Sequence, residues 1–136
     1  MMETVNGEVP IVVESDIVVA RRQIRAAAVA VGFGLTDVTR IVTAASELSR
    51  NIFQYAGSGE VKWLLLAAPH NGLEIQFVDA GPGIIDLDKA MQPGYTSGRG
   101  MGMGMPGAKR LMDEMVVHTE VGVGTTVIVR KWLRGS

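Results

Sequence analysis

The chain has 136 residues, of which 47% are apolar and 20% are charged, as expected for one domain with a packed core. A net charge of −1 argues against a basic surface for nucleic acid, and the absence of cysteine excludes disulfides and cysteine-ligated zinc. No apolar stretch of the sequence approaches the length of a membrane span. We therefore expect a single cytoplasmic domain, residues 1–136, whose partners are neither nucleic acids nor membranes.

Hydrophobic periodicity predicts helices and strands along the chain. Alternating apolar residues mark strands, apolar residues three or four apart mark helices, and Asn71-Gly72 is a hairpin turn signal. The expected elements are, in order, a strand, two helices, two hairpin strands, a helical turn, a third helix and two strands, at residues 9–14, 17–31, 36–56, 61–67, 73–79, 86–91, 105–114, 115–120 and 125–133. Ser15 or Asp16 is suited to cap the first helix. This order predicts an α/β (α+β) two-layer sandwich, with one mixed, mostly antiparallel sheet and helices on one face.

A glycine-rich run, Gly98-Arg99-Gly100-Met101-Gly102-Met103-Gly104, precedes the third expected helix. Glycine lets other groups approach the main chain closely, and a helix start offers free N–H groups to an anion. The run is compatible with a plain surface loop, with a mobile lid over the phosphates of a nucleotide, or with a dinucleotide-binding G-x-G-x-x-G motif. The dinucleotide motif is disfavoured because no strand precedes it, and a Walker loop is excluded because no Gly-Lys-Ser/Thr follows.

The strand expected at residues 73–79 ends on a carboxylate. A period of two places Asp79 on the same face as Leu73 and Phe77, where an ionised group needs a partner. A tight turn, Ala80-Gly81-Pro82-Gly83, follows it. Asp79 therefore either bonds the amides of this turn or accepts a hydrogen bond from a ligand, such as an adenine amino group, in a pocket that the two glycines keep open.

Glu47 and Asn51 lie four residues apart on the second expected helix and share a face outside its main apolar stripe. An amide oxygen suits Mg²⁺, and a carboxylate one turn away can take a proton from a hydroxyl group. On their own, two such residues are more often a solvated surface. Gly124-Thr125-Thr126 is likewise either a plain turn or a support for one end of a pocket.

Taken together and in order, these motifs resemble those of the GHKL ATP-binding fold, which histidine kinases, gyrase and Hsp90-type proteins share. The resemblance is carried by Glu47-x-x-x-Asn51, Asp79-x-Gly81-x-Gly83, the glycine run and Gly124-Thr125. Further segments resemble the RsbT-type serine/threonine switch kinases, from about residue 11 to residue 134: Asp16-Ile17-Val18-x-Ala20-Arg21, Glu47-Leu48-x-Arg50-Asn51-Ile52, Tyr55-Ala56-Gly57, Lys109-Arg110-Leu111-Met112-Asp113-Glu114 and Lys131-Trp132-Leu133-Arg134.

The resemblance implies an ATP- and Mg²⁺-dependent serine/threonine-protein kinase of a bacterial stress-response module that controls sigma factors by partner switching. Such kinases phosphorylate STAS-domain scaffold proteins, the RsbS and RsbR types of the stressosome, and then bind and activate a PP2C-type phosphatase similar to RsbU. Carried over by position, Glu47 is the general base, Asn51 the Mg²⁺ ligand and Asp79 the adenine acceptor. Nucleotide contacts are implied at Asn51, Asp79, Gly81, Gly83, Ile84, Gly98, Arg99, Gly100, Met101, Gly102, Met103, Gly104 and Thr125.

The chain departs from this family pattern at two places. Ile85 stands where a proline is common, and Arg99, Met101 and Met103 make the expected lid bulkier than is typical. Arg99 can instead help to neutralise phosphate charge. The alternative function is an anti-sigma factor that binds nucleotide mainly to hold its shape. A histidine kinase is disfavoured because no helical domain with a phosphoacceptor histidine precedes the fold.

Overall fold

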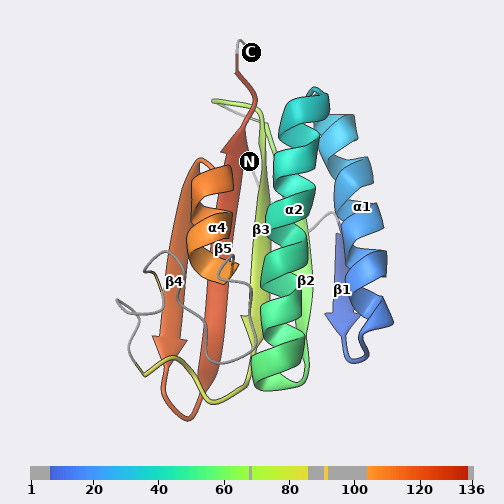
Figure 1. Cartoon of the computed structure of the whole chain (residues 1–136). Helices are drawn as coiled ribbons and strands as arrows, with labels where there is room; N and C mark the ends of the chain where they lie inside the picture. Colours follow the sequence, from blue (N-terminus) through green and yellow to red (C-terminus); the bar gives the residue numbers. More distant parts are fainter. Residues whose placement is uncertain (1–6, 68, 86–90, 92–103, 135–136) are drawn as a thin grey trace.

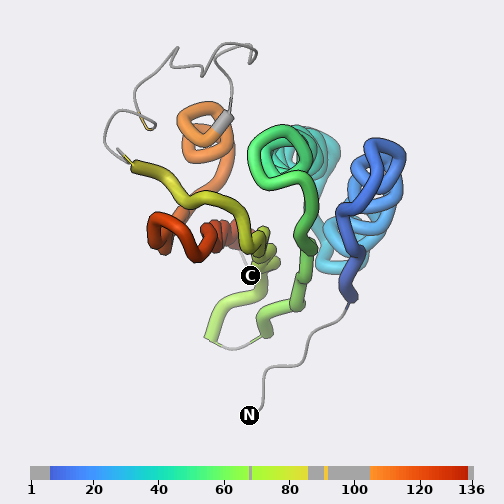
Figure 2. The backbone as a smooth tube through the Cα atoms, turned by 90° about the horizontal axis from the view of Figure 1, so that it is seen from below, coloured from blue at the N-terminus to red at the C-terminus, as the bar shows by residue number. Residues whose placement is uncertain are grey.

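A five-stranded sheet and a layer of helices on one of its faces make up the fold in the computed structural model, which describes residues 7–67, 69–85, 91 and 104–134 (Figures 1 and 2). The expected two-layer sandwich is thus confirmed. The strands are β1 (Gly7–Ile11), β2 (Gly59–Leu66), β3 (Gly72–Asp79), β4 (Glu114–Glu120) and β5 (Gly124–Trp132). The helices are α1 (Ser15–Val31), α2 (Leu35–Asn51) and α4 (Gly104–Leu111), and a π-helical turn, η1 (Ile52–Ala56), extends α2.

The strand order in the sheet is β1-β2-β3-β5-β4. The sequence predicts a mixed sheet, but each of the four described pairings is antiparallel. β3 pairs with β5 rather than with β4, the strand that follows it in the chain, so β4 lies at the edge of the sheet. The register pairs Asp79 with Gly59 on one side and with Thr125 on the other. The end of β3 therefore lies beside the beginnings of two strands.

The core lies between the sheet and the helices. As the alternation in β3 predicts, Leu73, Ile75 and Phe77 face the helices, and none is more than 2% exposed. The apolar stripe of α2 is also confirmed, since its members are buried against this face: Val38, Ile41, Val42, Ala45, Leu48 and Ile52. Burying one large apolar side chain contributes about 1.5–3 kcal/mol. This packing fixes α2 on the sheet.

The expected cap of the first helix is wrong in its geometry. The Oδ2 atom of Asp16 accepts the N–H groups of Val12 (2.9 Å) and Val13 (3.0 Å), which precede α1, and not those of the helix itself. These bonds, that of Val13 above all, lower the pKa of the Asp16 carboxyl. They also take up the two amides after β1, which ends at Ile11 and not at the expected residue 14.

Two expected helices end earlier than their patterns suggest. The helix expected at 36–56 is α-helical only as far as Asn51, and the wider turn η1 follows, closed by a hydrogen bond of 3.0 Å from the Gly57 N–H to the Ile52 carbonyl. The helix expected at 105–114 ends at Leu111, because the N–H of Asp113 already bonds the Arg130 carbonyl of the sheet (3.0 Å). Of the helical turn expected at 86–91, residues 86–90 lie outside the described residues.

The sheet face opposite the helices carries a charged cluster. Glu74 is only 4% exposed, and its two carboxylate oxygens accept hydrogen bonds of 2.7 Å from Gln76 and Arg130. Arg130 also bonds Glu114, whose other oxygen accepts the Trp132 indole N–H. The bonds from Trp132 and then from Arg130 lower the pKa of the Glu114 carboxyl. No helix in the described ranges is long and apolar enough to cross a membrane.

Ser49 of α2 allows a test of the core. Its side chain is 1% exposed, and its hydroxyl has no hydrogen-bond partner within the described residues. A buried hydroxyl without a partner costs about 1–3 kcal/mol, and alanine also has the higher helix propensity. Ser49→Ala should therefore raise the free energy of unfolding by about 1 kcal/mol in urea denaturation.

The matched control for Ser49→Ala is Ala45→Ser, which adds a hydroxyl at a nearby buried position of α2. This variant should lose stability by a similar amount. A Ser49→Ala protein less stable than the wild type would show that the hydroxyl has a partner in solution.

Candidate functional site

The candidate site lies at one end of the sheet, where β3 ends and β5 begins. Figure 1 shows the end of α2, the end of β3 and the turn from β4 to β5 at the same end of the molecule. A pocket of about 260 Å³ opens there. It is lined by the end of β3 and by the turn from β4 to β5, namely by Asp79, His118, Thr119, Glu120, Val123, Gly124, Thr125 and Thr126.

Asp79 bonds an amide of its own turn, the first of the two roles that its sequence position suggests. Its Oδ1 atom accepts the N–H group of Gly81 in its own turn (2.9 Å) and that of Thr125 at the start of β5 (3.3 Å). Its Oδ2 atom has no hydrogen-bond partner among the described residues, and the side chain is half-buried at the pocket. The carboxylate is therefore held in one orientation, with one of its oxygens unpaired within the described residues.

Thr119 is a site residue that the sequence reasoning missed. Its Oγ1 atom accepts the N–H group of Ile84 (2.9 Å) and lies 2.9 Å from Oγ1 of Thr125. Thr119 thus connects Ile84 with Thr125, two residues of the predicted site. It belongs to β4, a strand for which no functional residue was expected. The available signal was strand parity, because Thr119 follows Met115 and Val117 on the helix-facing side of β4.

The glycines of the Asp79 turn are needed by the protein's own packing. A Cβ atom on Gly81 would lie 2.5 Å from the Cβ atom of Ala56 in η1. Gly83 has φ +79°, and a Cβ atom there would lie 2.5 Å from the Glu120 carbonyl oxygen. The turn is thus pressed between η1 on one side and the end of β4 on the other.

Glu47 and Asn51 occupy the last turns of α2, on the side predicted from their spacing. The Glu47 side chain is 26% exposed, and its Oε2 atom lies 3.1 Å from Nη1 of Arg50. Asn51 is half-buried and ends the α-helix. Neither residue lines the pocket at Asp79, but η1, which follows Asn51 directly, contacts the Asp79 turn through Ala56 and Gly81.

The glycine run is the part of the predicted site that the structure does not describe. Gly98, Arg99, Gly100, Met101, Gly102 and Met103 lie outside the described residues, whereas Gly104 begins α4. Within the described ranges, no group of three or more histidine, aspartate or glutamate side chains could hold a metal ion. A divalent ion near Asn51 would need ligands from elsewhere, such as the oxygens of a bound nucleotide.

The chain matches a known protein family over most of its length. The family described as "Histidine kinase-like ATPase domain" matches residues 13–131. The chain belongs to this family. Membership in the histidine kinase-like ATPase family implies an ATP-binding domain, which agrees with the GHKL resemblance of the sequence motifs.

Comparison with individual relatives indicates which kind of histidine kinase-like ATPase this chain is. Serine/threonine-protein kinase RsbT of Bacillus subtilis (strain 168) is 46% identical over 127 residues, which cover 93% of this chain and 96% of RsbT. An anti-sigma F factor of Clostridium acetobutylicum is 33% identical over 102 residues, or 71% of each chain. The chain is thus a serine/threonine-protein kinase of the RsbT type, and the resemblance seen in the sequence is confirmed.

Two solved structures have a similar fold. The structure of the RsbU and RsbW domains of a Mycobacterium tuberculosis protein aligns with a TM-score of 0.65 and 17% identity, over 96% of this chain and 34% of that one. The mycobacterial sensor histidine kinase MprB aligns with a TM-score of 0.54 and 19% identity, over 70% of this chain and 71% of that one. At such identities these likenesses concern the fold alone.

Gly81→Ala tests the packing of η1 against the Asp79 turn. Because the added methyl group would meet Ala56, we expect a loss of about 1–3 kcal/mol in the free energy of unfolding, measured by urea denaturation. Gly34→Ala is the control, since Gly34 has φ −76° and no atom within 4 Å of an added Cβ, and it should lose less stability than Gly81→Ala. Equal stability of the Gly81→Ala and wild-type proteins would contradict the described contact.

Proposed function

We propose that this kinase binds Mg·ATP beside the ends of α2 and β3 and transfers the γ-phosphoryl group to a serine or threonine of a STAS-domain protein. The observation that carries the proposal is the oriented carboxylate of Asp79, with one oxygen available at the pocket, in a chain 46% identical to RsbT. In this proposal the kinase works by partner switching: after transfer, it leaves its RsbS- or RsbR-like substrate, and then binds and activates a PP2C-type phosphatase similar to RsbU.

The adenine end of the proposed site is built around Asp79. With Oδ1 occupied by two N–H groups, Oδ2 can accept the adenine amino group. Gly81, Gly83 and Ile84 form the turn beside the ring, and Thr125 stands opposite. The bond from the Ile84 N–H to Thr119 supports this arrangement, because it ties the turn to β4.

The phosphate end of the proposed site uses the last turns of α2. Glu47 acts as the general base for the substrate hydroxyl, and Arg50, 3.1 Å away, orients its carboxylate. The Asn51 side-chain oxygen binds Mg²⁺, and the phosphates supply further oxygen ligands. The run from Gly98 to Gly104, including Arg99, Met101 and Met103, closes over the phosphates. Phosphoryl transfer needs positioning and charge stabilisation above all, which these groups supply.

Asp79→Asn tests the adenine contact. The two N–H donors keep the amide oxygen at the Oδ1 position, so the amide NH₂ would replace Oδ2 and face the adenine amino group, donor against donor. We expect ATP affinity to fall at least about tenfold by calorimetry, because a hydrogen bond to a charged group is worth about 1.5–3 kcal/mol. Glu120→Gln, at another carboxylate of the same pocket, should bind ATP as the wild type does. Unchanged affinity in Asp79→Asn would remove Asp79 from the adenine site.

Glu47→Gln tests the general base. The variant should bind ATP with nearly normal affinity but transfer phosphate about 10²- to 10⁴-fold more slowly, since an amide cannot take the hydroxyl proton. Single-turnover transfer of labelled phosphate to the substrate protein measures this rate. Glu60→Gln, an exchange of the same kind on β2, is the control. A wild-type rate in Glu47→Gln would make Glu47 a surface residue of the helix.

The anti-sigma F factor among the relatives favours a second candidate, a protein that binds a sigma factor and uses nucleotide to hold its shape. Incubation with labelled ATP and purified STAS-domain proteins, and separately with sigma factors, distinguishes the two. Label on a serine or threonine of a STAS protein supports the kinase role proposed here. A stable complex with a sigma factor, and no labelled STAS protein, would favour the second candidate.

A further inference from the structure

Lys131 is a buried cation that the proposed reaction does not use. It lies on the helix-facing side of β5, in alternation with Thr125, Val127 and Val129, and the residue is 5% exposed. A buried ammonium group is costly unless it is paired and hydrogen-bonded. The groups that surround the ammonium group therefore have to compensate for its burial.

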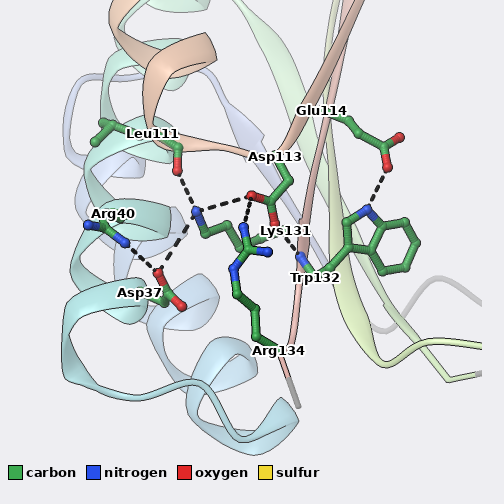
Figure 3. A network of polar contacts seen from close by, with 8 residues as sticks. All are labelled: Asp37, Arg40, Leu111, Asp113, Glu114, Lys131, Trp132 and Arg134. Atoms are coloured by element: carbon green, nitrogen blue, oxygen red, sulfur yellow. Dashed lines mark hydrogen bonds and ion pairs between the residues drawn. The ribbon is translucent and has the colours of Figure 1, made fainter. Parts of the chain in front are cut away.

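Three acceptors from separate segments surround the ammonium group (Figure 3). Its Nζ atom donates a hydrogen bond of 2.9 Å to the Leu111 carbonyl, and it lies 3.6 Å from Oδ1 of Asp113 and 3.8 Å from Oδ1 of Asp37. The Leu111 carbonyl lies at hydrogen-bond distance, and the two carboxylates lie at ion-pair distance. The group thus joins the end of α4, the residues leading into β4, and the first turn of α2.

The contact with Leu111 holds a helix end. Leu111 is the last residue of α4, where carbonyl groups lack intrahelical partners and the helix dipole favours a cation. A helix of eight residues is not stable by itself in water. α4 is held on the core by the buried side chains of Met105 and Ala108, and by Met112 directly after the helix, and apolar contacts of this kind are non-directional. Lys131 adds a directional contact at the end of the helix.

The two helices that Lys131 joins run in opposite directions (Figure 1). Asp37 lies in the first turn of α2 and Leu111 at the end of α4, whereas Asn51 ends α2 and Gly104 begins α4. The lysine thus connects the helices at the end away from Glu47 and Asn51. We propose that Lys131 is a positioning residue, which fixes α4 against α2 and so sets where α4 begins beside the phosphates of ATP. This inference rests on the function proposed above.

The arrangement allows the positioning role to be separated from stability. Each carboxylate around Lys131 has its own arginine, Arg40 for Asp37 and Arg134 for Asp113, both at 3.0 Å. Lys131→Met would therefore leave neither carboxylate unpaired, and methionine keeps a flexible chain of similar length. The Leu111 carbonyl is the one acceptor that loses its hydrogen bond, so we expect a small loss of stability and a folded protein.

The test uses the full chain with Lys131→Met and calorimetric titrations of Mg·ATP and Mg·ADP. We expect ATP affinity to fall about tenfold, within the range of coupling between distant groups. ADP affinity should stay within about twofold, because the start of α4 is proposed to lie beside the terminal phosphate, which ADP lacks. The urea midpoint should fall only slightly, since both carboxylates keep an arginine partner. Arg134→Gln is the control, since it removes an exposed cation from Asp113 without contacting α4, and its ATP affinity should be unchanged.

Asp37→Asn is the second variant, and it serves if Lys131→Met does not fold. It weakens the tie from Lys131 to α2, together with the exposed ion pair between Asp37 and Arg40, and leaves the bond to Leu111 intact. The loss of ATP affinity should therefore be selective but smaller, about threefold. Wild-type ATP affinity in either folded variant overturns the inference, as does an equal loss of ATP and ADP affinity that follows a lowered urea midpoint. A wild-type protein that binds no ATP would instead overturn the proposed function, and this inference with it.

Discussion

The hydrogen bonds to one oxygen of Asp79 hold the candidate site together. A single atom, Oδ1, accepts N–H groups from the turn after β3 and from the first residues of β5. These two segments come from distant parts of the chain and meet through the register that pairs Asp79 with Thr125. Thr119 adds a second connection of the same kind, from β4 to the Asp79 turn. The walls of the pocket are therefore set by sheet pairing together with a few polar contacts.

The π-helical turn after α2 connects the Asp79 turn to the helix layer. An ordinary α-helical continuation would place Ala56 differently, whereas η1 brings it against Gly81, which has no side chain to obstruct it. π-Helical turns of this kind frequently occur at functional sites. Here the irregular turn stands between Asn51 and the strand that leads back into the sheet, so the position of the α2 end and that of the Asp79 turn depend on each other.

Much of the fold could be predicted from local patterns, because periodicity reports which face of an element is buried. Leu73, Ile75 and Phe77 gave β3 and its orientation, and the stripe of α2 gave the helix over the core. The π-turn could not be predicted, since one turn of π-helix and one of α-helix place apolar residues almost alike. Asp16 was misjudged because a side chain at a helix start can bond backward as well as forward.

Less of the candidate site than of the fold could be predicted from local patterns. The position of Asp79 followed from strand parity, but the roles of Glu47 and Asn51 came from the order of motifs in a family and not from their spacing. The partners of Lys131 were not foreseeable, because Asp37 and Leu111 approach it only through the tertiary fold. Thr119 was overlooked for a similar reason, since its contact with Ile84, 35 residues earlier in the chain, forms only in the folded protein.

The strand order β1-β2-β3-β5-β4 has a consequence for how the chain assembles. Residues 7–79 hold three strands that pair with their neighbours in sequence, and residues 104–134 hold the β4–β5 hairpin and α4. These two halves meet chiefly where β3 pairs with β5 and α2 packs on α4. The entropy of closing the connection between them grows only slowly with its length, by about 0.6 kcal/mol per doubling. Such non-local pairing forms late in folding. The pocket at Asp79 and Thr125 lies where these two halves meet, so it forms only when they dock. A ligand bound there therefore stabilises the fully folded chain over partly folded forms.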